Sequence, residues 1–328
     1  MKKELTVIIT ANLIPSHPGI TQIKNVIDSL DFLGLPDDMH IILAHDNIHP
    51  EVAEVLTKAQ ARYDKYFRDI QQYIDNSCKY KRVDVVMCSE WGHLTRNVLN
   101  AISNVDTPYI LLLQHDLPFI RKLSLADAFD IVKNNADVKH LRFNHRKNLP
   151  TGWDGTDSRY DPLKCVEAFK EVSTAHGPIC KTLCWSDRNH IASTQHYIDV
   201  IFPACDVDST TSFMEQKLNR KNKLTPEKYG TYIYGAYGEN AYIESTDGAV
   251  TYIPDFIFDE QYCLKKYPEL ASLAVKPNSL KNIYVDRYGH TPCLSEDFNW
   301  IEYSQLIGRK FKSPNSAYRY FKNNSTNK

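Results

Sequence analysis

The tripeptide Gln114-His115-Asp116 directly follows residues 109–113, an apolar run typical of a buried strand. A carboxylate at this place can hold a divalent cation, because open α/β sheets bind ligands just beyond the carboxyl ends of their strands. Hard cations such as Mg²⁺ and Mn²⁺ prefer oxygen ligands. We therefore predict that Asp116 binds a metal ion, whereas Gln114 can hydrogen-bond a hydroxyl group but adds no charge.

Strands and helices alternate in the segments before this tripeptide. Residues 5–10 are a β-branched apolar run, typical of a strand buried on both faces, and residues 40–44 are a second strand. Apolar side chains recur at helical spacing between them, from Ile20 to Leu33. Such a βαβ unit favours a parallel sheet with a right-handed crossover. The pattern continues with a helix in 51–76, a strand at 83–88, a helix at 91–101 and the strand at 109–113.

The alternation continues beyond the tripeptide and breaks near residue 225. We predict helices at 125–134, 193–202 and 208–220, strands at 139–143 and 181–185, and a pair of short strands within 227–255. The run from Asn222 to Pro226 interrupts the pattern. We therefore expect an α/β fold whose mostly parallel sheet is flanked by helices. It would consist of a domain of residues 1–225 and a C-terminal α+β extension of residues 226–328 that completes the binding cleft.

Two runs of this sequence, residues 91–101 and 107–116, resemble the core of GT-A glycosyltransferases, and most closely the large inverting family two. In that family a helix containing Gly, Arg-Asn and Ala leads into a strand that ends in Asp-x-Asp. The matching residues here are Gly92, Arg96, Asn97, Ala101 and Asp116, and Gln114 replaces the first acid. The resemblance covers about the first two-thirds of the chain. It implies a GT-A-like Rossmann-type sheet, a nucleoside-diphosphate sugar as donor, and Mn²⁺ or Mg²⁺ at Asp116.

The resemblance also implies which residues contact the nucleotide. Asp46 follows the second strand and matches the acid that hydrogen-bonds the base or ribose; a turn-forming Asp before Pro50 is the alternative. Ala11 and Asn12, at the end of the first strand, would lie beside the same nucleotide. The set implied for the donor is Ala11, Asn12, Asp46, Arg96, Gln114 and His115.

A general base and a second metal ligand follow from the same resemblance. Residues 213–220 resemble the start of the family's helix Glu-Asp-x-x-Leu-x-x-Arg, and Glu215 matches the acid that removes the acceptor proton. A surface glutamate on an amphipathic helix is the alternative, and Asp206 and Asp208 lie nearby as substitutes. GT-A enzymes often take a late histidine as an additional metal ligand, which here is His290; a structural histidine is the alternative.

Residues 185–194 resemble a segment that lines the acceptor cleft in several capsule-type transferases. Trp185 could stack on a sugar face, and Asp187 or His190 could hold hydroxyl groups. A loop that caps the following helix is equally consistent with this sequence. Arg142, His145 and Arg146 follow a strand and could contact phosphate, because the guanidinium fork fits phosphate oxygens.

Composition excludes several classes of protein. The 328 residues carry a formal net charge of −1 and 42% apolar residues, so we expect a packed core and no nucleic-acid partner. The eight cysteines show no paired metal spacing and read as free thiols in a reducing compartment. The apolar run near the start is too short for a signal peptide or a membrane span. We expect a soluble cytoplasmic protein; its basic tail is either a solvated end or an anion-docking patch.

Two further function classes stay open beside the glycosyltransferase that acts on a glycan or glycoconjugate acceptor. The first is a sugar nucleotidyltransferase, which needs a Gly-rich loop with Arg or Lys after the first strand; residues 11–19 hold neither Arg nor Lys. The second is a carbohydrate-binding protein on the same fold without catalysis. No Gly-x-Gly-x-x-Gly, Walker loop or Gly-x-Ser-x-Gly occurs in this sequence, which argues against dinucleotide binding, P-loop chemistry and α/β-hydrolase chemistry.

Overall fold

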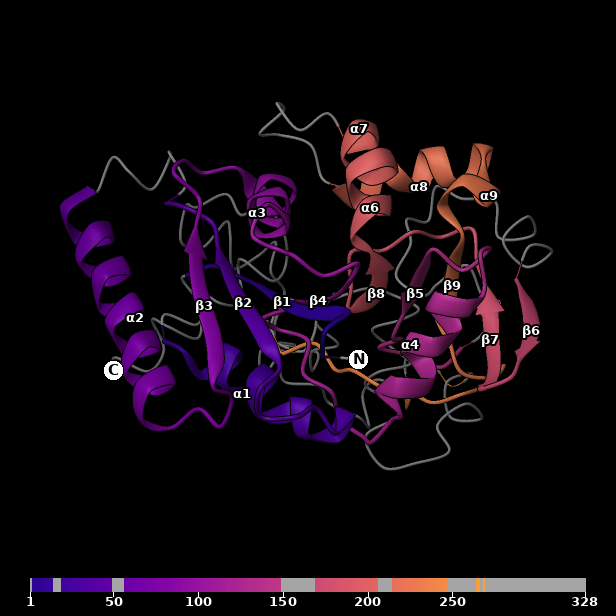
Figure 1. Ribbon diagram of the computed structural model, residues 1–328, viewed down its shortest axis with the longest axis horizontal. Helices are drawn as coiled ribbons and strands as arrows, with labels where there is room; N and C mark the ends of the chain where they lie inside the picture. The colour runs from indigo at the N-terminus through magenta and orange to yellow at the C-terminus, as the bar shows by residue number, and fades with distance from the viewer. Residues whose placement is uncertain are drawn as a thin grey trace. The chain divides into compact units, whose positions relative to one another are not determined.

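The computed structural model describes residues 2–13, 19–48, 56–148, 169–205 and 214–246, together with residues 264, 265 and 268. The chain divides into two units, Met1–Asp247 and Gly248–Lys328. The elements that follow all belong to the first unit. Figure 1 shows them along the chain from indigo to orange.

A large sheet forms the centre of the first unit, and its strands alternate with helices over the first half of the chain (Figure 1). The strands are β1 (Leu5–Ala11), β2 (His40–His45), β3 (Arg82–Met87), β4 (Tyr109–Gln114), β5 (His140–Arg142), β6 (Lys170–Thr174), β7 (Gly177–Lys181), β8 (His190–Ser193) and β9 (Thr231–Tyr234). The helices are α1 (Thr21–Ser29), the 3₁₀-helix η1 (Leu30–Leu33), α2 (Leu56–Asn76), α3 (His93–Ile102), α4 (Leu125–Asn134), α6 (Thr194–His196), the π-helix η3 (Tyr197–Ile201), α7 (Phe202–Cys205), α8 (Met214–Leu224) and α9 (Pro226–Tyr229).

The strand order of the sheet is β3-β2-β1-β4-β8-β5-β9-β7-β6. Strands β3, β2, β1 and β4 run parallel to one another. Strand β8 is antiparallel to both β4 and β5, and β9 is parallel to β5. The chain therefore builds outward from β1 to β3, then returns to place β4 on the other side of β1. That reversal makes the β1–β4 junction the topological switch point of the parallel part.

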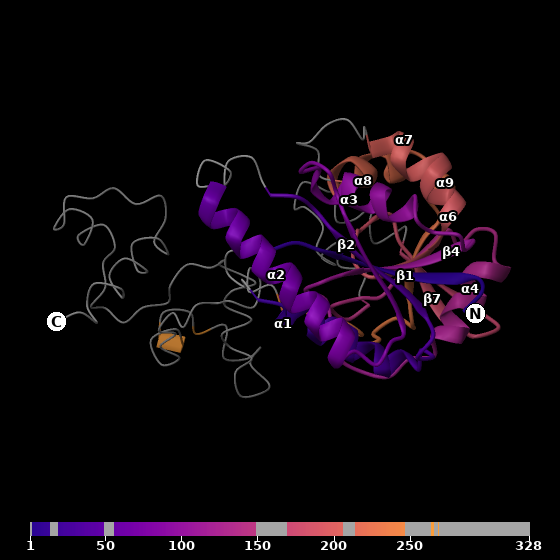
Figure 2. The ribbon, with the colours of Figure 1, turned by 60° about the vertical axis from the view of Figure 1, so that its left-hand side comes forward.

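Helices cover both faces of the sheet (Figures 1 and 2). On one face the side chains of β1, β2 and β4 pack with α1, α2 and α4; this core includes Ile9, Leu43 and Phe129. On the other face the alternate side chains of the same strands pack with α3, α7, α8 and α9; this core includes Ile8 and Leu112. Burial on both faces explains why these strands read as continuous apolar runs.

The structure confirms the predicted fold class, a mixed α/β fold with a large central sheet flanked by helices. The strands expected from residue 5 to residue 113 occur within a residue or two of the predicted places. One expectation further along was wrong: the strand expected at 181–185 lies at Gly177–Lys181. The segment at 185–194 opens a helix at Thr194 as expected, but it also contains β8, which was not expected.

The predicted domain boundary after residue 225 falls within the first unit, because β9 pairs with β5 and β7 in the sheet. Whether residues 226–328 act as a functional extension stays a prediction. Among the described residues, no helix combines the length and the apolar content that crossing a bilayer requires.

Candidate functional site

Three of the predicted donor residues, Ala11, Gln114 and His115, lie at the switch point of the sheet. In the register of the strands Thr10 of β1 lies beside Gln114 of β4, and Ala11 lies beside His45 of β2. The His115 backbone N–H donates to the Thr10 carbonyl over 3.0 Å, so the pairing continues into the turn after β4. Open α/β sheets bind ligands outside the carboxyl ends of the strands at such a reversal of strand order. The ends of β1, β2 and β4 are therefore the candidate site.

The turn after β4 is hydrogen-bonded to the loop before β8. Gln114 donates its backbone N–H to Asn189 Oδ1 and its side-chain Nε2 to the Asp187 carbonyl, each over 3.0 Å. Asn189 in turn donates Nδ2 to the Leu117 carbonyl over 2.7 Å, and its own side chain is fully buried. These bonds fix the Asp116 turn against the loop that carries Asp187 and Arg188.

Three carboxylates and a guanidinium interact at this place. The pKa of Asp187 is raised to about 7, mainly by burial and also by the Glu215 and Asp116 carboxylates, while Arg188 opposes this shift. Burial lowers the pKa of Arg188, whereas Glu215, Asp187 and Asp116 raise it. Mutual influence of this kind requires that the four groups lie close together. Perturbed carboxyl groups next to a specific charged partner are a recurring property of active sites.

Glu215 reaches this cluster from the first turn of α8. Met214 and Leu218 on the same helix are buried in the core beside the sheet, which sets the orientation of the helix. Glu215 is partly exposed and interacts electrostatically with Arg142 as well as with Asp187 and Arg188. The structure thus brings the predicted base and the predicted metal ligand into one cluster.

Basic residues border the carboxylates on the side of β5. The pKa of His145 is lowered to about 3, mainly by burial and also by the positive charges of Arg188, Arg146 and Arg142. The Phe143 N–H donates to the Asn189 carbonyl over 2.8 Å, which places this end of β5 beside the Arg188 loop. An anionic ligand that reached Asp116 would therefore meet positive charge on one side and carboxylates on the other.

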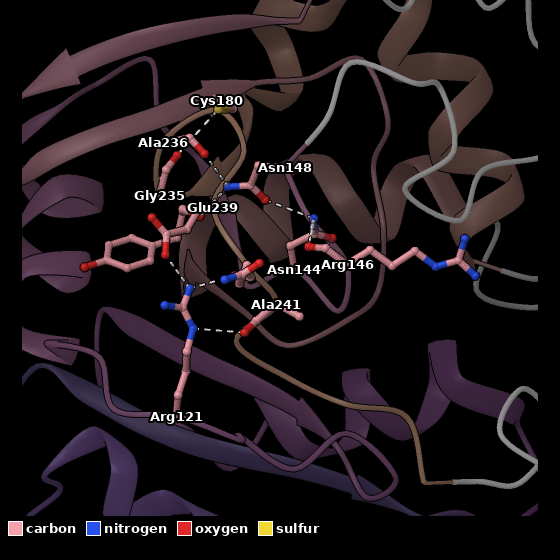
Figure 3. Close-up of polar contacts among 11 residues, drawn as sticks. Arg121, Asn144, Arg146, Asn148, Cys180, Gly235, Ala236, Glu239 and Ala241 are labelled. Atoms are coloured by element: carbon pink, nitrogen blue, oxygen red, sulfur yellow. Dashed lines mark hydrogen bonds and ion pairs between the residues drawn. The ribbon is translucent and has the colours of Figure 1, made fainter. Parts of the chain in front are cut away.

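A separate polar network holds the turn that carries Arg146 (Figure 3). Asn144 donates Nδ2 to the Arg146 carbonyl and to Asn148 Oδ1, over 2.6 and 2.9 Å. Asn148 donates Nδ2 to the Tyr234 and Ala236 carbonyls at the end of β9. The Arg146 side chain extends away from these bonds in Figure 3. The network therefore orders the backbone and leaves this guanidinium outside it.

The residues predicted to read the nucleotide have structural partners of their own. Asp46 is 4% exposed, and its Oδ1 accepts the N–H groups of Asn47 and Gly92 over 2.9 and 2.8 Å, at the start of α3. These bonds are those of the turn-forming alternative, and the nucleotide contact of Asp46 stays a prediction. Asn12 Oδ1 accepts from the Leu13 N–H and the Tyr63 hydroxyl.

The other predicted donor contacts are distributed around the same edge. The Ala11 side chain packs in the core, so only the Ala11 backbone could contact a ligand at the end of β1. Arg96 lies on α3, with its guanidinium 4.0 Å from the Glu90 carboxylate. His115 lies close to His45, whose pKa falls to about 3, mainly by burial and also through His115. The side-chain amide of Gln114, expected at a ribose hydroxyl, donates instead to the Asp187 carbonyl.

Two predicted acceptor contacts were wrong. Trp185 and His190 are fully buried and cannot touch a sugar in this structure. Trp185 belongs to the core beneath the sheet. The His190 ring nitrogens lie 2.5 Å from the Arg188 carbonyl and 2.7 Å from the Tyr197 hydroxyl. Asp187, the third member of that set, lies at the site as described above.

The predicted metal site stays a prediction. Among the described residues, no group of three or more His, Cys, Asp or Glu side chains is arranged to hold a metal ion. His290 lies outside the described residues. Asp116 still fits an ion whose remaining ligands come from a diphosphate, because Mg²⁺ in nucleotide sites is usually bound by one or two carboxylates together with phosphate oxygens.

Sequence reasoning missed Arg188, Asn189 and Thr246. Arg188 and Asn189 stand next to Asp187 directly before β8, and a strand prediction at 190–193 would have drawn attention to them. Thr246 donates its backbone N–H and its Oγ1 to the Asp116 carbonyl, over 2.7 and 3.0 Å. No sequence signal connects Thr246 with Asp116, since 130 residues separate them.

No model of a known protein family matches the sequence, and no curated protein matches it. Solved structures give distant likenesses. S. aureus TarS is 15% identical at a TM-score of 0.40, over 93% of this chain and 47% of TarS. TarS 1-349 in complex with UDP-GlcNAc is 13% identical at 0.41, over 85% and 69%.

A third likeness is to the mannosyltransferase PcManGT from Pyrobaculum calidifontis, in complex with GDP-Man and Mn²⁺. It is 9% identical at a TM-score of 0.43, over 71% of this chain and 56% of that one. This chain spans about half the length of the longer TarS structure. At such identities and TM-scores the likenesses assign no activity, and the geometry of the chain itself carries the functional argument.

Proposed function

We propose that this protein is an inverting glycosyltransferase of the GT-A type, similar to family two, that moves a sugar from a nucleoside-diphosphate sugar to a hydroxyl group of a glycan or glycoconjugate. One observation carries the proposal: Asp187 and Arg188 each interact electrostatically with both Asp116 and Glu215, beside the end of β4 at the switch point of the parallel sheet. That is where open α/β sheets bind nucleotides. The cluster offers carboxylates that can transfer a proton, and it also offers a positive charge that can bind a diphosphate.

Each group then has a distinct task. Glu215 is the proposed general base, which removes the proton from the attacking acceptor hydroxyl. Arg188 and the basic residues at the end of β5 interact with the diphosphate as negative charge develops on it. Asp187 orients the acceptor hydroxyls. These groups come from β5, α8 and the loop before β8, so the sheet positions them before the substrates bind.

Asp116 is the proposed metal ligand, together with His290. A bound Mn²⁺ or Mg²⁺ would supply Lewis-acid neutralisation of the departing nucleoside diphosphate, worth several kcal/mol in transition-state stabilisation. The protein's part is to hold the Asp116 carboxylate in a fixed place. The side chain of Asn189 bonds the backbone of Gln114 and Leu117 on either side of Asp116, and Thr246 donates twice to the Asp116 carbonyl. We further propose that the reaction belongs to polysaccharide synthesis in the cytoplasm.

Release of nucleoside diphosphate from a panel of UDP, GDP and dTDP sugars, with Mn²⁺ and a mixture of glycan acceptors, tests the proposal. We expect release with at least one donor, and a loss of about 10²-fold or more in kcat for Glu215→Gln with unchanged donor binding. Pyrophosphate formation from a nucleoside triphosphate and a sugar phosphate would instead identify a nucleotidyltransferase. Glycan binding with no donor turnover would leave a carbohydrate-binding protein.

A further inference from the structure

The loop of residues 187–189 is held at every one of its backbone carbonyls. The Asp187 carbonyl accepts from Gln114 Nε2 over 3.0 Å, and the Asn189 carbonyl accepts from the Phe143 N–H over 2.8 Å. The Arg188 carbonyl lies 2.5 Å from His190 Nδ1. The backbone carbonyls of the loop are therefore bonded to the end of β4, to the residue directly after β5 and to the first residue of β8.

The Asn189 side chain also uses both ends of its amide. Oδ1 accepts the Gln114 backbone N–H and Nδ2 donates to the Leu117 carbonyl, while the residue is fully buried. Together with the Gln114 side-chain bond, these contacts join the turn at 114–117 to the loop at 187–189 from both directions. Buried polar networks with every member bonded are rigid, because breaking one bond leaves a desolvated group without a partner.

The bond from Gln114 to the Asp187 carbonyl requires a side-chain donor. A carboxylate at position 114 has acceptors only, so it would repel the Asp187 carbonyl that the amide now binds. The bond to the loop at 187–189 therefore explains why position 114 holds an amide and not an acid. An acid there could serve a metal ion but could not hold the loop in the observed way.

We propose that Gln114 is a positioning residue, which fixes Asp187 and Arg188 relative to Asp116 and Glu215 by binding the loop at 187–189. This inference rests on the proposed function, since it assigns a role within that reaction. Position 114 then contributes to the geometry of the reacting groups and not to binding of the nucleotide or the metal ion. A misplacement of about 1 Å at a reacting group can lower a rate about 10²-fold, which makes the role measurable.

Gln114→Met is the test variant, because methionine keeps the length of the side chain and removes its donor. The control is Gln71→Met on the exposed face of α2, where Nε2 donates to the Asp75 carboxylate over 2.8 Å, within one helix and away from the site. For Gln114→Met we expect kcat to fall about 10²-fold. The nucleoside-diphosphate Kd should stay within about twofold of the parent, and hydrogen exchange of the amides in 186–189 should become faster. The control should match the parent in each measurement.

Gln114→Glu separates positioning from metal binding. We expect it to lose turnover as Gln114→Met does, without tighter Mn²⁺ binding. Higher turnover or higher Mn²⁺ affinity in Gln114→Glu would overturn the inference, because position 114 would then be a ligand position. A weaker nucleoside-diphosphate Kd in Gln114→Met with unchanged kcat would also overturn it.

The positioning role of Gln114 and the proposed glycosyltransferase function are disproved by different results. An unchanged kcat in Gln114→Met with a lower melting temperature would reduce Gln114 to a structural residue and leave the proposed function intact. A parent protein that releases no nucleoside diphosphate from any donor would remove the proposed function, and the positioning role with it.

Discussion

Asp116 is the residue whose side chain and backbone have separate tasks. Its carbonyl accepts two bonds from Thr246, while its partly exposed carboxylate interacts with Asp187 and Arg188. Asp116→Ala keeps the backbone bonds and removes the carboxylate. We expect turnover to be abolished and the melting temperature to stay within about 2 °C of the parent, as substitutions of partly exposed side chains change stability little. Activity assays and thermal unfolding check this; an unaltered rate would remove the metal assignment.

Asp187 gives a prediction for the pH dependence of stability. Its pKa is about 7 in the folded protein against 3.8 as the ordinary value, so the folded state binds more protons between these two values. Stability from this group is therefore present at low pH and is lost as pH rises towards 7. Relative to Asp187→Asn, the parent should lose unfolding free energy as the pH rises from about 4 to about 7, between these two pKa values.

Urea unfolding of both proteins at several pH values measures this difference. Comparison with Asp187→Asn is needed because the titration of buried His190 and His145 changes the unfolding free energy in the opposite direction. Burial lowers their pKa values to about 4 and about 3, so they destabilise the folded state as pH falls. A difference between parent and variant that does not change with pH would contradict the environment described for Asp187.

At the scale of elements, β8 is joined to the helical segment after it through His190 and Tyr197. Burial keeps His190 neutral, with a pKa of about 4, so it carries one N–H. Nδ1 donates to the Arg188 carbonyl, and Nε2 then accepts from the Tyr197 hydroxyl. Tyr197→Phe leaves Nε2 buried without that partner. We expect a loss of about 1–3 kcal/mol in unfolding free energy, measured by urea titration.

Tyr237→Phe is the control for this change, because Tyr237 is 56% exposed and should vary by less than about 0.5 kcal/mol. Equal effects of the two substitutions would show that the buried bond does not support β8. Faster hydrogen exchange at Arg188 in Tyr197→Phe would further locate the effect in the loop beside the site.

Arg121 connects the segment after β4 with the turn after β9 (Figure 3). Its guanidinium donates to the Ala241 carbonyl and to the Glu239 carboxylate over 2.9 and 2.6 Å, and lies 3.6 Å from the centre of the Tyr242 ring. Arg121→Ala should lower the unfolding free energy by about 1–3 kcal/mol. Arg121→Lys should restore only part of it, since an ammonium group lacks the planar fork. Full stability in Arg121→Ala would reject this connection.

The sequence predicted the elements that are buried on two faces. Strands β1, β2 and β4 are continuous apolar runs because helices cover both sides of them. Strand β7 was misplaced and strand β8 was missed, because each has only four or five residues and β8 includes the polar residues His190 and Ser193. Their places are set by pairing with β9 and β4, and long-range pairing leaves no local pattern in the sequence.

The sequence could predict the acidic residues of the candidate site, but not the residues that hold these acids in place. Asp116 and Glu215 were found because they match short motifs, and Asp187 because it lies in one. Trp185 and His190 were placed wrongly because exposure depends on packing that the sequence does not display. Likewise, the Gln114 amide and Asn189 act through partners about 70 residues away.

At the scale of the whole molecule, the first unit contains the entire sheet and every described residue of the candidate site. A chain that ends at Asp247 should therefore fold cooperatively, with the far-ultraviolet circular dichroism of an α/β protein. If His290 contributes to the metal site as proposed, this fragment should bind nucleoside diphosphate more weakly in Mn²⁺ than the full chain does. Equal binding and turnover would remove His290 and residues 248–328 from the reaction.

A crystal structure of the full chain with a nucleoside diphosphate and Mn²⁺ tests the central claim most directly. The account predicts that the diphosphate lies outside the carboxyl ends of β1 and β4, within contact distance of the Asp116 carboxylate and on the Arg188 side of the cluster. A nucleotide bound elsewhere on the protein, or an Asp116 carboxylate that has no contact with the ion or the diphosphate, would contradict it.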